Sequence, residues 1–282
     1  MATSKLFDND FENKWCPGCG NFPILSAMKK AFTDLGLTPA DLLLVSGIGQ
    51  AGKTPHFLNC NMFHSLHGRA LPVATGAKIA NKDLNIVVNS GDGDCYGEGG
   101  NHFVAAIRRN IDITLIVHNN MIYGLTKGQA SPTTAMGMAT PIQPAGTMSS
   151  PVNPLALAIS QGAGFVARGF SGEIETLTRL IVQAMEYRGF SLIDVLQPCV
   201  SFNRVNTLQW YKDRVYDLGE TGHDMTDKQS ALERSNEWEE KIPLGILYRE
   251  EKPTFHDRVK RLAEGPLIAH KFDAKAVAAA LF

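Results

Sequence analysis

The chain has 282 residues, which is enough for one large α/β domain or two small ones. Its 27 basic and 28 acidic side chains nearly balance, and the sequence contains no block of Lys and Arg. This balance argues against nucleic acid or an anionic membrane surface as a partner.

The sequence also indicates a cellular setting. Residues 1–10 are polar and acidic and lack the apolar core of a signal peptide, and no apolar run reaches the length of a membrane span. Five cysteines in a chain of this length do not suggest a disulfide scaffold. We therefore expect a cytoplasmic protein that does not enter a membrane.

A Cys-x-x-Cys pair, Cys16 and Cys19, opens the first predicted helix, whose apolar residues are spaced to bury one face. The pair could be a redox dithiol, half of a zinc site or two ligands of an iron–sulfur cluster. Zinc would need a second Cys or His pair at short spacing, and a thioredoxin-like motif would follow a strand. The cluster interpretation is favoured, provided that further ligands come from elsewhere in the chain.

An apolar run at residues 42–46 predicts a strand that ends in a Gly-x-Gly turn at Gly47 and Gly49. This turn is a strand end where bare backbone could pack against a cofactor. Lys53 follows, and its cation could pair with a substrate carboxylate or simply be solvated. His67 belongs to a group of three histidines and one arginine that modestly favours a polar site; the other members are His56, His64 and Arg69. A helix is predicted at residues 71–82.

The central unit is a predicted strand–helix–strand motif. Residues 86–88 and 113–117 have the length and β-branched content of buried parallel strands. Between them, the apolar residues within 99–110 are spaced to lie on one face of a helix. Polar residues gather where the two strands end. In open α/β sheets this edge is where ligands bind.

Gly91 and Gly93 flank Asp92 directly after the first of these strands, and Asn120 follows the second. The glycines allow a sharp turn and a close approach to a ligand, and the next helix offers free N–H groups to a phosphate. Oxygens of Asp92 and Asn120 suit magnesium. The arrangement resembles that of thiamine diphosphate enzymes; the competing interpretation is an ordinary turn in which Asp92 caps a helix.

The rest of the chain alternates loops with regular elements. Residues 131–151 predict an irregular loop that serves a site or an interface. Helices are expected at 154–161 and 173–188, and strands at 165–167 and 191–196, with Cys199 directly after the last strand. From residue 201 charged residues become frequent, and we expect a C-terminal extension with a short strand at 243–248. The predicted division is an α/β domain at 1–200 and an extension at 201–282.

Motifs along nearly the whole chain resemble the β subunit of 2-oxoacid:ferredoxin oxidoreductases. They lie at residues 15–20, 66–72, 91–94, 108–110, 119–120, 123–129, 131–133 and 243–246. The resemblance implies a parallel sheet with helices on both faces in a thiamine diphosphate-binding fold. It implies oxidation of a 2-oxoacid, with 2-oxoglutarate favoured, and CoA to acyl-CoA, CO₂ and reduced ferredoxin. An α subunit would complete the enzyme as an αβ or (αβ)₂ assembly.

The resemblance also implies roles for single residues. Magnesium would be held by Asp92, Asn120 and the carbonyl of Ile122, and an iron–sulfur cluster of the 4Fe-4S type by Cys16, Cys19 and Cys199. Lys53, His67 and Leu125 would act at the reacting centre. The implied cofactor-binding residues are Ile48, Gly49, Gln50, Ala51, His67, Gly91, Asp92, Gly93, Asp94, Asn120, Gly124 and Leu125.

One departure from the family pattern affects the cluster. The family usually has Cys-Ser where this chain has Gln50-Ala51, whereas a 4Fe-4S cluster normally takes four thiolates. Cys60 is the better candidate for the fourth thiolate and Cys95 the weaker one. The alternatives are a non-cysteine ligand, a labile cluster or none. A non-redox thiamine diphosphate decarboxylase or carboligase subunit, and a noncatalytic assembly subunit, therefore stay open.

Overall fold

The structure is a computed structural model, and it describes residues 4–269, 271 and 275. Its centre is an eight-stranded sheet with the order β2-β1-β3-β4-β8-β7-β10-β9. The strands are β1 (Leu42–Ser46), β2 (Asn61–His64), β3 (Asn85–Gly91), β4 (Ile113–Asn119), β7 (Phe165–Phe170), β8 (Phe190–Leu196), β9 (Val215–Asp217) and β10 (Ile242–Arg249). All neighbouring pairs are parallel except β7 and β10, which run antiparallel.

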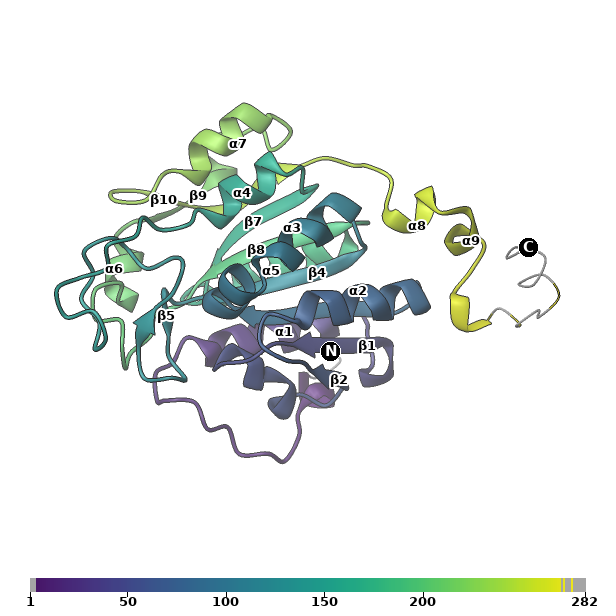
Figure 1. The fold of residues 1–282 in the computed structure, drawn as a ribbon, viewed down its shortest axis with the longest axis horizontal. Helices are drawn as coiled ribbons and strands as arrows, with labels where there is room; N and C mark the ends of the chain where they lie inside the picture. Colours follow the sequence, from purple (N-terminus) through teal and green to yellow (C-terminus); the bar gives the residue numbers. More distant parts are fainter. Residues whose placement is uncertain (1–3, 270, 272–274, 276–282) are drawn as a thin grey trace.

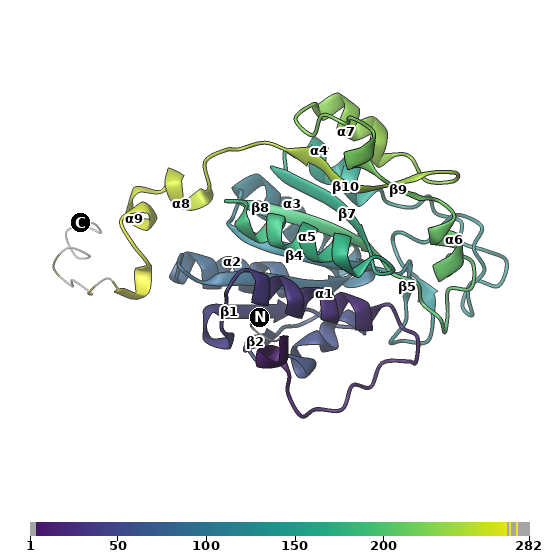
Figure 2. The same cartoon turned by 180° about the vertical axis from the view of Figure 1, so that it is seen from behind.

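Helices cover both faces of this sheet. Figure 1 shows α2 (Ala70–Ala80), α3 (Gly100–Arg109) and α4 (Pro154–Ser160) over one face. The reverse view in Figure 2 shows α1 (Asn21–Asp34) and α5 (Ile174–Glu186) over the other. This arrangement confirms the predicted fold class.

The strand sequences explain why both faces are covered. Side chains alternate between faces along a strand, and each central strand has apolar residues at successive positions. Val88 and Leu115 pack in one buried cluster with α2, α3 and α4, whereas Val87 and Ile116 pack in the other with α1 and α5. A strand that is apolar on both sides is stable only between two layers of helices.

The C-terminal part adds strands to the same sheet. β10 pairs with β7, which confirms the strand predicted at 243–248, and β9 pairs with β10. The remaining elements of this part are short: α6 (Leu208–Lys212), α7 (Lys228–Ser235), α8 (Phe255–Arg258) and α9 (Lys260–Ala263). The division of the chain at residue 200 stays a prediction.

Several boundaries differ from the prediction. A π-helix (Gly93–Glu98) lies between β3 and α3, a 3-10 helix (Ala51–Phe57) follows β1, and β2 was not predicted. The loop at 131–151 is irregular as expected; in this described part of the chain it contains no helix or strand. Before it, β5 (Ile122–Tyr123) and β6 (Gln129–Ala130) form a small hairpin. Among the described residues, no helix combines the length and the apolar character needed to cross a membrane.

Candidate active site

A pocket lies where β1, β3 and β4 end at their carboxyl edge. Every residue predicted to bind the cofactor lines it, together with Ile122, Tyr123 and Thr126. The fold brings these residues together because β3 lies between β1 and β4 in the sheet. The pocket measures only about 50 Å³, far below the several hundred Å³ that usually hold a cofactor. The pocket of this chain by itself is therefore too small to enclose a cofactor.

Asp92 is the buried carboxylate of this pocket. Its Oδ2 accepts hydrogen bonds from Ser131 Oγ at 2.5 Å and Thr133 Oγ1 at 2.6 Å. Burial raises the pKa of Asp92 to about 6, against the lowering effect of these two hydroxyls. Among residues 4–269, no Lys or Arg forms an ion pair with it. A buried carboxylate without a cationic partner suits a metal ion.

The other oxygens of the predicted magnesium site come from one tight turn. Asn120 Oδ1 accepts the N–H of Ile122 at 3.0 Å, and Met121 between them has a φ of 59°. This left-handed conformation is uncommon for a residue with a side chain. Thr134 Oγ1 donates to the Met121 carbonyl at 2.6 Å and holds the turn. Carboxylate, amide and carbonyl oxygens in one pocket form a donor set that fits magnesium.

Gly93 is needed for space rather than for its backbone angles. Neither Gly91 nor Gly93 has a positive φ, so the expected sharp turn does not depend on glycine conformational freedom. A Cβ at Gly93 would lie 2.3 Å from the ring of Tyr123, whereas one at Gly91 would meet nothing nearer than 4.0 Å. The Tyr123 hydroxyl donates to the Gly93 carbonyl at 3.2 Å. The aromatic ring thus packs against bare backbone at the turn formed by residues 91–94, the predicted diphosphate turn.

Asp94 connects three loops of the site. Its Oδ1 accepts the N–H of Ile48 at 3.1 Å and that of Gly68 at 2.8 Å, and it lies 2.8 Å from His67 Nδ1. Its Oδ2 accepts from Ser90 Oγ at 2.5 Å. The side chain is 3% exposed. Asp94 therefore fixes the loop after β1 and the loop before α2 against the turn after β3.

The predicted catalytic residues are only partly brought together. His67 and Leu125 line the pocket, but Lys53 is not among its lining residues; it lies half-buried in the 3-10 helix after β1. The histidine group also separates, because His64 forms a hydrogen bond with Ser46 Oγ through Nδ1 at 2.9 Å, and its ring lies 5.7 Å from that of His56. Of that group, only His67 reaches the pocket.

Three cysteines meet in a second, adjacent cavity of about 30 Å³, the thiol cavity. Cys16, Cys19 and Cys199 line it together with Gln50. Ser201 Oγ donates to Cys16 Sγ at 3.2 Å. Burial raises the pKa of the Cys19 thiol. Among the described residues, no three Cys, His, Asp or Glu side chains lie close enough for a single metal ion. Three sulfurs around a cavity, rather than around a point, suit a cluster whose thiolates bind different irons.

Cys60 lies at the opposite ends of the strands from the three cysteines. It directly precedes β2, which runs parallel to β1 in the register Leu43 with Asn61. It therefore stands at the amino ends of the strands, whereas the thiol cavity lies beyond their carboxyl ends. Burial raises its pKa to about 11, and it packs against apolar residues. Cys95 is fully buried beside the diphosphate turn. Neither lines the thiol cavity.

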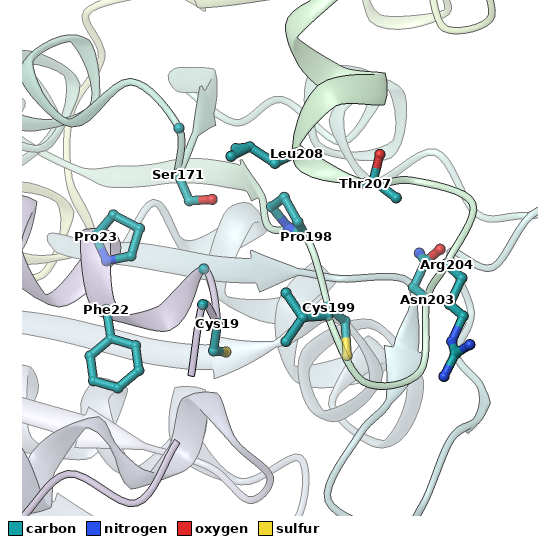
Figure 3. A pocket seen from close by; sticks show the side chains of 14 residues that line it. Cys19, Phe22, Pro23, Ser171, Pro198, Cys199, Asn203, Arg204, Thr207 and Leu208 are labelled. Atoms are coloured by element: carbon teal, nitrogen blue, oxygen red, sulfur yellow. The ribbon is translucent and has the colours of Figure 1, made fainter. Parts of the chain in front are cut away.

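An outer cavity of about 630 Å³ adjoins the cysteines and is mostly apolar. Figure 3 shows Cys19, at the start of α1, and Cys199, after β8, on facing segments of its wall. Pro23, Pro198 and Leu208 surround them, and Arg204 lies at the side. Two of the three thiols are therefore shared between this outer cavity and the small inner one.

Comparisons with known proteins agree with this geometry. A family model described as the C-terminal TPP binding domain of thiamine pyrophosphate enzymes matches residues 47–195. A second, for the C-terminal part of the pyruvate ferredoxin oxidoreductase beta subunit, matches residues 199–264. The beta subunit of 2-oxoacid:ferredoxin oxidoreductase from Saccharolobus solfataricus is 48% identical over 264 residues, covering 89% of this chain and 86% of the relative.

The chain belongs to the β subunits of the 2-oxoacid:ferredoxin oxidoreductase family. The subunit beta of 2-oxoacid:ferredoxin oxidoreductase 1 from Aeropyrum pernix is 46% identical over 87% of this chain and 80% of its own length. A solved structure of 2-oxoglutarate:ferredoxin oxidoreductase from Magnetococcus marinus, with 2-oxoglutarate, coenzyme A and succinyl-CoA bound, matches with a TM-score of 0.92. It is 37% identical and covers 99% of this chain and 95% of that one.

These findings confirm the resemblance, the fold and the interpretation of the chain as an oxidoreductase subunit that binds thiamine diphosphate. The name β subunit also implies a partner subunit. Sequence reasoning missed Ser131 and Thr133, which donate hydrogen bonds to Asp92, and Thr134, which donates to the Met121 carbonyl. Only the stretch 131–133 belongs to the resemblance, and nothing in it assigns these hydroxyls a role, because a hydroxyl in an irregular loop carries no periodic signal.

Proposed function

We propose that this β subunit, with its α subunit, catalyses oxidative decarboxylation of a 2-oxoacid with CoA to acyl-CoA, CO₂ and reduced ferredoxin. The observation that carries the proposal is the pocket at the carboxyl edge, where the predicted cofactor residues converge on buried Asp92. The ligands named for the Magnetococcus structure favour 2-oxoglutarate. A cytoplasmic location and an αβ or (αβ)₂ assembly are parts of the same proposal.

Asp92, Asn120 and the Ile122 carbonyl would hold magnesium, and the N–H groups that begin the π-helix at Gly93 would face the diphosphate. When bound, thiamine diphosphate supplies the carbanion chemistry that decarboxylation requires. The hydroxyls of Ser131 and Thr133 keep the Asp92 carboxylate oriented. The protein's part is thus to neutralise the diphosphate and to hold it in one position.

His67 and Lys53 would serve the substrate side. Asp94 and Glu98 lie 2.8 and 3.4 Å from His67 Nδ1, which leaves Nε2 as the ring nitrogen that would serve a bound group. Lys53 follows the loop that lines the pocket and would bind the carboxylate common to 2-oxoacids. Leu125, which is 39% exposed, would contact the reacting part of the substrate.

A substitution tests the role of Lys53. Lys53→Met should raise the KM for the 2-oxoacid at least about tenfold, because a charge-assisted hydrogen bond contributes about 1.5–3 kcal/mol. Lys53→Arg keeps the cation and serves as the matched control. An unchanged KM in the Met variant would remove Lys53 from the substrate site.

The thiols of Cys16, Cys19 and Cys199 would hold a 4Fe-4S cluster, which would carry electrons singly to ferredoxin. Activation of the cofactor calls for a carboxylate, and no glutamate lines the pocket within the described part of the chain. We assign that carboxylate to the α subunit, which would also close the shallow pocket. The β subunit alone should therefore be inactive.

The deciding experiment uses the β subunit co-expressed with its α subunit and purified without oxygen. Iron, acid-labile sulfide and bound thiamine diphosphate are measured, followed by CoA-dependent reduction of ferredoxin with 2-oxoglutarate and with pyruvate. Iron, sulfide and ferredoxin reduction together would support the proposal. Bound thiamine diphosphate with CO₂ release but no iron and no ferredoxin reduction would favour a non-redox decarboxylase or carboligase. Absence of thiamine diphosphate binding would favour an assembly subunit.

A further inference from the structure

We propose that Gln50 completes the cysteine site, so that the cluster is held by three thiolates and one exchangeable oxygen ligand. This inference rests on the cluster of the proposed function and concerns its fourth donor. It assigns that position to an amide oxygen at the carboxyl edge of the sheet rather than to Cys60 or Cys95.

The position of Gln50 is fixed beside the cysteines. It lines the thiol cavity, and its side-chain Oε1 is buried with no hydrogen-bond partner among the residues that the structure describes. The indole Nε1 of Trp15 donates to the Gln50 carbonyl at 2.8 Å, and Trp15 directly precedes Cys16 in the chain. Trp15 is itself 5% exposed and packs against Phe57. A buried indole thus ties the Gln50 loop to the Cys-x-x-Cys loop.

A second amide oxygen at the same cavity has no partner either. Gln197 donates through Nε2 to Cys19 Sγ at 3.4 Å, while its Oε1 is buried and accepts no hydrogen bond within the described part of the chain. Carbonyl oxygens can only accept hydrogen bonds, and buried ones nearly always find a donor. Two unbonded oxygens beside three thiols form a set of electron-pair donors that lacks an acceptor. A metal-containing group is the acceptor that this set fits.

The two other cysteines are placed differently. Cys60 lies at the amino ends of the strands, whereas the cavity lies beyond their carboxyl ends. Cys95 is buried under the diphosphate turn, among Asp92, Asp94 and Asp194, where a thiolate would be repelled. A fourth thiolate from either would require the chain to move. Gln50 needs no movement because it already lines the cavity.

The ligand type has a chemical consequence. Soft thiolates hold the irons of a cluster more strongly than neutral amide oxygen does. An iron without a thiolate is therefore released on mild oxidation. One electron passes from the 4Fe-4S cluster to ferricyanide, which becomes ferrocyanide; one Fe²⁺ leaves, and a 3Fe-4S cluster with all four sulfides remains.

The test uses the αβ complex purified and reconstituted without oxygen. After one equivalent of ferricyanide, released Fe²⁺ is measured with a chromogenic chelator and the cluster type by EPR. The wild type should release about one Fe²⁺ per cluster and show the three-iron signal. Gln50→Cys should slow the release at least about tenfold and retain the four-iron cluster. Gln50→Ala should release iron at least as fast as the wild type.

Two controls separate the possible causes. Thiamine diphosphate content is measured in every variant, because Gln50 also lines the cofactor pocket. Cys60→Ser should leave the iron content and the release rate unchanged. Loss of iron in Cys60→Ser, or a wild type as resistant as Gln50→Cys, would overturn the role of Gln50 while leaving the oxidoreductase intact. A complex that binds no iron at all would overturn the cluster itself and this inference with it.

Discussion

Asp94→Ala is expected to destabilise the β subunit, because Asp94 holds three loops together rather than facing open solvent. The substitution leaves the N–H of Gly68 without a partner in a buried position and that of Ile48 in a partly buried one. Ser90 loses less, since its hydroxyl can donate to the Gly91 carbonyl, 3.3 Å away. An unsatisfied buried donor costs about 1–3 kcal/mol. The expected loss in the free energy of unfolding is therefore about 2–5 kcal/mol.

Asp94→Asn distinguishes the hydrogen bonds from the charge. Its carbonyl oxygen can keep both backbone N–H partners, so only the charge-assisted part is lost, about 1–2 kcal/mol. Equilibrium urea unfolding of the full-length β subunit gives the free energy of unfolding of the wild type, of Asp94→Ala and of Asp94→Asn. Asp83→Ala is the matched control, because Asp83 is exposed. Equal losses for Ala and Asn, or an Ala variant as stable as the control, would refute the bridging role of Asp94.

Three further substitutions follow from the structure. Thr133→Val removes a donor 2.6 Å from Asp92 and should weaken magnesium-dependent binding of thiamine diphosphate about 10- to 100-fold in calorimetry; unchanged affinity would contradict this. Burial lowers the pKa of His256, so its contribution to stability is present above about pH 6.5 and is lost as the pH falls. His256→Gln should therefore flatten the decline of the melting temperature between about pH 7.5 and 5.5, and an equally steep decline would disprove it. Trp15→Phe deletes the bond to the Gln50 carbonyl and should cost about 1 kcal/mol in urea unfolding; no change would show that the indole contact is dispensable.

The sequence indicates most of the sheet because its central strands are apolar at consecutive positions. β3, β4 and β8 lie in the middle of the sheet between helices on both faces, and burial on both sides leaves consecutive apolar residues at 86–88, 115–117 and 192–193. β2 was missed for the opposite reason. It is one of the two edge strands, and all four of its residues are exposed, so no periodicity marks it.

The site was predictable where it follows strand ends and not where it depends on loops. Asp92 and Asn120 come directly after buried strands, so parallel pairing of β3 and β4 places them at one edge. The approach of Thr133 to Asp92 comes from an irregular loop with no such rule. Cys60 shows the limit of proximity in sequence. Cys60 follows β1 closely in sequence. Because β2 runs parallel to β1, however, the chain between them must first return to the amino ends of the strands, and this return carries Cys60 away from the site.

The shared wall between the two small cavities has a consequence for protein engineering. Gln50, Asn120 and Gly124 line both the cofactor pocket and the thiol cavity. A substitution that reshapes the pocket for another 2-oxoacid at these positions would also change the surroundings of the proposed cluster, and with them its reduction potential. Laboratory evolution for a new substrate should therefore diversify other lining positions, such as Leu125 and Thr126, which face the cofactor pocket alone.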